Sequence, residues 1–166
     1  MAVETVYGKF LGAPLQGKPM RGGSDIHQGI PYKPLIDAAT IPGAASVGSV
    51  IVLGSVPSRS VISRLGYIAH AALGAGVTLD VGVQDDATIG LTGQGDILVD
   101  GEDSAAADSF SVAAGVSYAD NGKPLWQLAG LSEDPLVEMT LIATIGGAAV
   151  SAGDKAITWE IPYTSY

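Results

Sequence analysis

A period of two runs through residues 76–84 of this chain. Val77, Leu79, Val81 and Val83 alternate there with Thr78, Asp80, Gly82 and Gln84. Such alternation is typical of a β-strand with one face on a core and the other in water. Leu136–Ile145 repeats the pattern, and Ala156–Ile161 places Ile157, Trp159 and Ile161 on one side. Because no segment shows a helical period as clearly, we expect an all-β protein.

Less regular apolar stretches predict the remaining strands. Val47–Leu53 is almost continuously apolar, which is typical of a strand covered on both faces or lying at a subunit contact. Further strands are expected at Val61–Ala71, around Ile89–Leu91 and Ile97–Val99, at Ser109–Val116, and at Leu125–Leu131, which carries Trp126. Ser104–Asp108 is read as a helical turn, and Asn121-Gly122 is typical of a tight turn. About eight strands at this spacing predict an antiparallel β-sandwich, with a jelly roll as the first choice of topology.

The first 46 residues differ from the rest of the chain. They contain five of the nine prolines and no sustained apolar period, and proline removes a backbone donor and disfavours helix before it. We therefore predict an extended N-terminal arm over residues 1–46 and a sandwich domain over 47–166. The arm is either a disordered tail or a docking arm, and its large apolar residues favour docking. The expected partner-binding residues are Tyr7, Phe10, Leu11, Tyr32, Leu35 and Ile36.

Charge and composition exclude several classes of function. Residues 1–46 carry four bases and three acids, whereas residues 47–166 carry four bases and fourteen acids. Such an acidic body argues against nucleic-acid binding, which requires a basic surface. The uncharged stretch Ala38–Ser58 contains prolines, glycines and hydroxyls, so we expect no membrane-spanning helix, and the N-terminus has no apolar core of a secretory signal. The chain has no cysteine, which excludes disulfides and thiolate metal sites.

The sequence contains no complete catalytic motif. Gly12–Lys18 resembles a phosphate-binding loop, but Pro19 stands where that loop needs Ser or Thr, and no helix can start there. His27 and His70 are the only histidines and are more typical of structural residues than of metal ligands. The sequence contains no Gly-x-Ser-x-Gly nucleophile motif. We therefore expect a protein that is not an enzyme and that needs no cofactor.

Two groups of residues leave other functions open. Eight acids lie in residues 80–108, and the segment Asp100–Asp103 offers oxygen ligands for calcium, although its spacing fits no EF-hand and a solvated acidic rim is the simpler interpretation. The same acids leave open a hydrolase with paired carboxylates. Tyr118 and Trp126 could line a sugar-binding groove, whereas Trp159 is expected in the core. Tyr163 and Tyr166 are candidate interface residues.

Three segments together resemble a known family. Gly48–Leu53, Val56–Ile62 and Thr78–Val83 form a strand, a bend centred on Pro57 and an alternating strand. This succession resembles the decoration (cement) proteins on the outside of tailed-bacteriophage heads, and the likeness covers roughly residues 47–161. It implies a homotrimeric, non-enzymatic virion protein that binds the major capsid protein on the capsid exterior, after synthesis in the bacterial cytoplasm. It implies no nucleic-acid, membrane or small-molecule partner. The alternative is a carbohydrate- or receptor-binding β-sandwich module.

Overall fold

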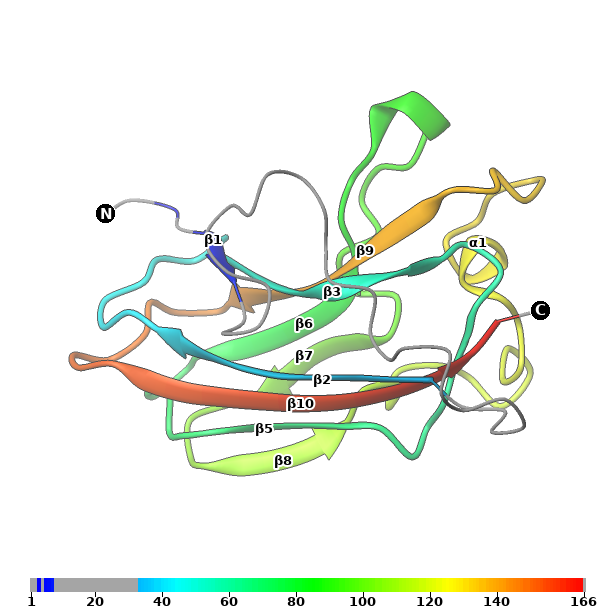
Figure 1. The fold of residues 1–166 in the computed structure, drawn as a ribbon. Helices are drawn as coiled ribbons and strands as arrows, with labels where there is room; N and C mark the ends of the chain where they lie inside the picture. Colours follow the sequence, from blue (N-terminus) through cyan, green and yellow to red (C-terminus); the bar gives the residue numbers. More distant parts are fainter. Residues whose placement is uncertain (1–2, 4, 8–32, 166) are drawn as a thin grey trace.

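Two β-sheets packed face to face make up the fold (Figure 1). The computed structural model describes residues 3, 5–7 and 33–165. The first sheet contains, in spatial order, β1 (Thr5–Tyr7), β3 (Val50–Pro57), β9 (Glu138–Gly146), β6 (Thr78–Val83) and β7 (Val99–Asp103). The second contains β2 (Lys33–Ile41), β10 (Lys155–Thr164), β5 (Tyr67–His70) and β8 (Asp108–Ser111), with β4 (Val61–Ile62) paired to β10. A 3-10 turn, η2 (Ala87–Ile89), and a one-turn helix, α1 (Leu125–Leu128), lie in connections between strands.

The strand order confirms the predicted jelly roll. When β1 and β4 are set aside, the order is β3-β9-β6-β7 in one sheet and β2-β10-β5-β8 in the other. Every connection between consecutive strands of this set crosses from one sheet to the other, except that between β6 and β7. This is the double Greek-key arrangement of jelly rolls. Within the described residues the neighbouring strands pair antiparallel, apart from β1, which runs parallel to β3.

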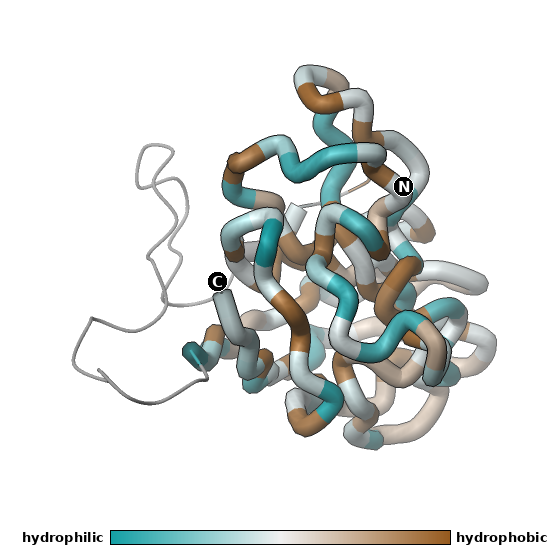
Figure 2. Tube along the Cα trace, turned by 90° about the vertical axis from the view of Figure 1, so that its right-hand side faces the viewer, coloured by the Kyte–Doolittle hydropathy of each residue, from teal (hydrophilic) through white to brown (hydrophobic). Residues whose placement is uncertain are grey.

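The alternating segments form the core between the sheets. Val77, Leu79, Val81 and Val83 are at most 1% exposed, as the alternation predicts. The inward residues of β9 and β10 are at most 5% exposed, and Figure 2 shows apolar and hydrophilic positions alternating within short stretches of chain. Burial of apolar area at roughly 25 cal/mol per Å² is the main stabilising term for such a sandwich.

Trp159 joins the two sheets. Its side chain is 1% exposed, and its indole Nε1 on β10 donates to the carbonyl oxygen of Leu53 on β3 over 2.9 Å. That carbonyl lies at a β-bulge, where the pairing of β3 with β9 shifts register between Val52 and Gly54. A bulged residue drops out of the regular ladder, so Leu53 can accept a bond from the opposite sheet. The prediction that Trp159 belongs to the core is confirmed.

The sandwich starts earlier in the chain than the predicted boundary at residue 46. Nine residues of β2 pair with β10, from Ile41 opposite Lys155 to Lys33 opposite Tyr163. The inward residues Leu35, Ala39 and Ile41 of this strand are at most 5% exposed. Residues 8–32 of the predicted arm lie outside the described residues.

The predicted strand at Leu125–Leu131 is wrong, because its first half is the helix α1. Pro124 precedes the helix with extended backbone, and Gly130 follows it with a φ of 74°. Leu125 and Ala129 are buried at a spacing of four residues, and the backbone N–H of Ala129 donates to the carbonyl of Leu125. A proline before and a glycine after a helical spacing are signals that the sequence contained.

Other predicted elements differ in extent. The expected strand at Val61–Ala71 is two strands, β4 and β5, separated by a turn that contains Gly66. A Cβ at Gly66 would contact Pro162 and Val112 at 2.8 Å, which explains why glycine stands there. The strand expected at Ser109–Val116 ends at Ser111, and Ser104–Asp108 forms no helical turn. Around Ile89–Leu91 the expected strand is replaced by η2 and by a single bridge between Asp86 and Leu91.

Candidate partner-binding surfaces

The residues predicted to bind a partner separate into three groups. Phe10, Leu11 and Tyr32 lie outside the described residues. The backbone of Tyr7 is the last position of β1 and pairs with Val52. Leu35 and Ile36 are neighbours on β2 and face opposite sides. Leu35 is 5% exposed and packs in the core, whereas Ile36 is 59% exposed. Of the predicted residues with a described side chain, Ile36 is thus the one available to a partner.

Ile36 belongs to a row of side chains on the outer face of the second sheet that places two large apolar groups on either side of a glutamate. Glu160 of β10 stands opposite both Ile36 of β2 and Tyr67 of β5, so the three side chains cross the sheet in one row. Tyr67 is 44% exposed. The next row consists of the small residues Ala38, Thr158, Ala69 and Ser109. Exposed large apolar groups beside small uncharged residues are typical of a protein–protein interface, and Glu160 adds one charge between Ile36 and Tyr67.

The loop between β6 and β7, residues 84–98, is the most prominent projection in Figure 1. It folds back onto its own base, because the backbone N–H of Val83 donates to the carbonyl of Gln94 over 2.8 Å. A Cβ at Gly82 would overlap that same carbonyl oxygen. Only glycine therefore lets the loop approach the sheet this closely.

Most of the acidic run serves to hold turns together. Five of its carboxylates accept a backbone N–H: Asp80 from Gly101, Asp85 from Gly93, Asp86 from Thr88, Asp103 from Ala105 and Asp108 from Ser109, over 2.7–3.0 Å. The hydroxyl and the backbone N–H of Thr88 both donate to Asp86, and these bonds lower the pKa of that carboxyl. The bonds of Asp86 and Asp103, each to the N–H two residues on, are Asx turns, and all five bonds give these aspartates a structural role.

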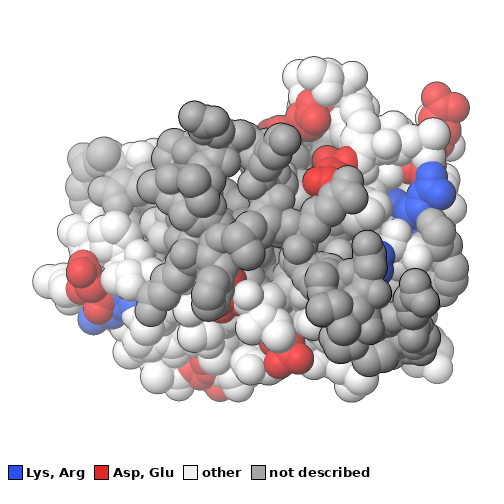
Figure 3. Space-filling view, viewed as in Figure 1, with Lys and Arg blue, Asp and Glu red and all other residues white. Residues whose placement is uncertain are grey.

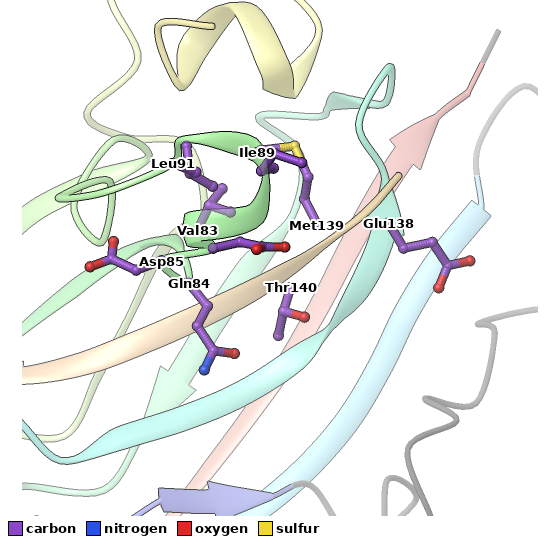
Figure 4. A pocket seen from close by; sticks show the side chains of 9 residues that line it. Val83, Gln84, Asp85, Ile89, Leu91, Glu138, Met139 and Thr140 are labelled. Carbon is purple, nitrogen blue, oxygen red and sulfur yellow. The ribbon is translucent and has the colours of Figure 1, made fainter. Parts of the chain in front are cut away.

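A cavity of about 270 Å³ lies at the foot of this loop (Figure 4). Val83, Ile89, Leu91 and Met139 supply its apolar lining, and Gln84, Asp85, Asp86, Glu138 and Thr140 its polar lining. In Figure 4 the carboxylates of Asp85 and Glu138 point in opposite directions. Hydrolysis by paired carboxylates requires two acids that flank the bond to be cleaved, and these two carboxylates do not point toward a common position. A second cavity of about 220 Å³ adjoins Asp80, Asp96 and Thr144.

The calcium hypothesis finds no supporting geometry in the described part of the chain. Asp100–Asp103 lies within β7, at the edge of the first sheet, and the carboxylate of Asp103 accepts the backbone N–H of Ala105. Within the described residues, no three His, Cys, Asp or Glu side chains come together in a way that could hold a metal ion. Figure 3 likewise shows acidic side chains spread over the visible described surface instead of gathered in one patch.

The connection before β9 contains another structural carboxylate. Asp134 accepts a hydrogen bond from the hydroxyl of Ser58, another from the backbone N–H of Leu136 over 3.0 Å, and lies 3.5 Å from the guanidinium of Arg59. The Ser58 hydroxyl is the main reason that the pKa of Asp134 is lowered. This cluster fixes the turn after β3 to the segment before β9.

His70 is a buried residue of β5, and His27 lies outside the described residues. The side chain of His70 is 5% exposed, its Nδ1 lies 3.0 Å from the carbonyl oxygen of Ala71, and its ring is tilted against Phe110. Its Nε2 is buried, with no hydrogen-bond partner among the described residues. These contacts agree with the structural role expected for this histidine.

Tyr118 and Trp126 line neither of the two cavities described above. Tyr118 is 90% exposed, but Trp126 is half-buried and packs against the core. Tyr163 is 5% exposed within its own subunit, so it is not an exposed interface residue, and Tyr166 lies outside the described residues.

Within the described part of the chain, no helix is long and apolar enough to cross a membrane.

Comparison with solved structures finds this fold in a phage capsid. The chain is similar to a chain in the structure "Capsid of Ralstonia phage GP4", with a TM-score of 0.59, 17% sequence identity and coverage of 98% of both chains. A chain in the structure "Cyanophage Pam1 capsid asymmetric unit" matches with a TM-score of 0.48, 14% identity and coverage of 93% of this chain and 98% of that one. No family model and no curated protein matches the sequence. At 17% identity the first likeness shows a shared sandwich fold.

Proposed function

We propose that this chain is a non-enzymatic structural protein of a phage virion, which binds the outside of the capsid as a homotrimer and stabilises the lattice of the major capsid protein. The observation that carries the proposal is the full-length likeness to a chain of the Ralstonia phage GP4 capsid structure. The sequence independently resembles decoration proteins in residues 47–161. The chain would be made in the host cytoplasm and reside on the virion exterior.

The outer face of the second sheet supports self-association. Ile36 and Tyr67 leave large apolar groups in water on the same face, and covering them with another copy of the chain removes that area from water. A trimer matches a three-fold position of a capsid lattice without a symmetry mismatch. Three linked attachment points also raise the effective concentration of each contact, so that weak individual contacts give tight binding.

The first experiment measures mass and shell binding separately. Light scattering should give a particle of about three times the 16.7 kDa of one chain. Purified protein added to closed shells of the major capsid protein from the same phage should sediment with them, and protein bound after shell assembly must lie on the outside. A monomer that leaves such shells bare would refute the proposal.

Paired variants test the contact face. Replacing both Ile36 and Tyr67 with lysine should give monomers, because six cations would be buried in the trimer. Tyr118→Lys removes an aromatic ring that is more exposed than Tyr67, 90% against 44%, from a loop outside the second sheet, and this variant should remain trimeric. If both variants remain trimeric, the contact lies elsewhere. If both are monomers, the loss of the trimer is not specific to the second sheet.

The carbohydrate-binding alternative rests on Tyr118, whose ring is 90% exposed. Jelly rolls also occur among lectins, and exposed aromatic faces can stack on sugars. A glycan array with wild-type protein and the variant Tyr118→Ala tests it. Binding that disappears in the variant would favour this function over attachment to a capsid.

A further inference from the structure

Two of the sheet edges carry acidic side chains. An edge strand presents unpaired backbone groups to other chains, and proteins commonly protect it with charge, proline or an inward-facing ionised residue. In the first sheet, the edge strand β7 contains Asp100, Glu102 and Asp103. In the second sheet, the edge strand β8 begins with Asp108. Repulsion between acids discourages pairing of either edge with another strand.

The edge strand β2 is protected differently. Pro34 lacks the N–H that a neighbouring strand would need. Asp37 occupies an inward position of β2, where it is 7% exposed, between the buried Leu35 and Ala39. An inward-facing acid and an edge proline both discourage further strand pairing.

β3 has neither form of protection. The stretch Val50–Leu53 is entirely apolar, the strand contains no charged residue, and its proline is the last residue, Pro57. Its open edge is instead covered by β1, through the parallel pairs Thr5–Val50, Val6–Ile51 and Tyr7–Val52. Val6 also packs against the core. The β3 edge is therefore built to accept an added strand, which is a known mode of protein recognition.

The connection between β1 and β2 is longer than pairing within one subunit requires. β1 lies beside the start of β3, and β3 follows the end of β2, so the chain after Tyr7 must return along the length of β2 to Lys33. That path is about 30 Å along β2 plus about 10 Å between the sheets, which roughly a dozen extended residues would cover. Residues 8–32 number twenty-five. Fully extended, they would reach about 80–90 Å, enough to cross a subunit contact.

We propose that the Val50–Val52 edge of β3 is a strand-acceptor site, which Thr5–Tyr7 of a neighbouring copy fills in the assembled trimer. This inference rests on the trimer of the proposed function. Exchange of an identical element makes the same contacts as pairing within one chain, so it loses no pairing or packing. Passing one strand from each subunit to the next also closes a ring of three, which locks the trimer together.

Engineered cysteines test the exchange directly, because the chain has none of its own. Thr5 and Val50 are paired positions, and Thr5 is exposed. Neighbouring strands hold paired Cα atoms about 5 Å apart, within the range for a disulfide. The double variant T5C/V50C is purified as a trimer, diluted, oxidised or treated with a short bismaleimide, and run on a denaturing, non-reducing gel. Exchange predicts covalently linked dimers and trimers in place of single chains.

The control uses a pair that must lie within one chain. Ser55 of β3 and Thr140 of β9 are paired, and their hydroxyl oxygens are 3.1 Å apart, so S55C/T140C should give single chains only. If T5C/V50C also gives only single chains, both after oxidation and after bismaleimide treatment, the exchange is refuted. This holds whether the two introduced thiols are linked within one chain or remain free. Trimers that sediment with shells but show no interchain link would reject exchange alone. Monomers that leave the shells bare would reject the proposed function itself.

Discussion

Replacing Trp159 with phenylalanine should destabilise the protein by about 2–4 kcal/mol, because the indole both fills the core and joins the two sheets. Its Nε1 donates to the Leu53 carbonyl over 2.9 Å, and the side chain is 1% exposed. Phenylalanine keeps most of the ring volume and loses the donor. The substitution therefore isolates the bond at the bulge of β3 better than a change to alanine would.

Two contributions make up this magnitude. Losing its donor leaves the Leu53 carbonyl buried and unsatisfied, which costs about 1–3 kcal/mol. The smaller ring adds roughly 1 kcal/mol for lost transfer energy and for the small cavity left behind. The bulge offers no substitute partner within the ladder, since the pairing of β3 with β9 skips Leu53 between Val52 and Gly54.

Urea denaturation followed by circular dichroism measures the difference, with wild type and variant at one protein concentration because association contributes to stability. Trp126→Phe is the matched control. Trp126 is half-buried on α1, so this change should cost about 1 kcal/mol or less. If the unfolding free energies of the two variants differ by less than about 0.5 kcal/mol, the bond between the sheets does not contribute the stability predicted for it.

Three further predictions concern single positions. In urea denaturation at a protein concentration low enough that the chains are monomers, Leu35→Ala should lower the unfolding free energy by about 2–5 kcal/mol, whereas Ile36→Ala, on the outer face of the same strand, should change it by less than about 1 kcal/mol; similar losses would contradict the described facing of β2. Gly82→Ala should loosen the loop 84–98, because a Cβ there overlaps the Gln94 carbonyl; hydrogen exchange should rise in this loop but not in β9, and unchanged exchange would refute the close approach. Asp134 has a lowered pKa, so its stabilising effect is present above the ordinary carboxyl pKa and is lost as pH falls through the lowered value. The stability difference between wild type and Asp134→Asn should therefore be larger at about pH 7 than at about pH 3, and a difference that grows in acid would contradict the assignment.

The candidate surfaces could be predicted from sequence only in part. Sequence reasoning placed Leu35 and Ile36 together as partner-binding residues, because both are large apolar groups in a proline-containing segment. The strand β2 turns one into the core and the other outward. The acidic run suggested a ligand site, but five of its aspartates accept backbone N–H groups, and that use depends on which N–H lies nearby. The edge of β3 had a local signal in its apolar, uncharged stretch, but nothing local shows that the stretch lies at an edge.

For the regularly alternating strands, the sequence alone showed which side chains face the core. Alternation in β6, β9 and β10 depends only on neighbouring residues, since successive side chains of a strand point to opposite sides. That local rule predicts an all-β sandwich and its main core residues. It failed in β2, where Asp37 interrupts the apolar positions and Pro34 resembles a loop signal.

Only the tertiary structure decided which strands are neighbours. β2 pairs with β10 across more than a hundred residues, and the first and last long strands of the jelly roll lie side by side. Alternation states which face is apolar and is silent about the partner, because any two strands with one apolar face can pair. Which strands become edges, and hence which surfaces are open to another chain, follows from that pairing.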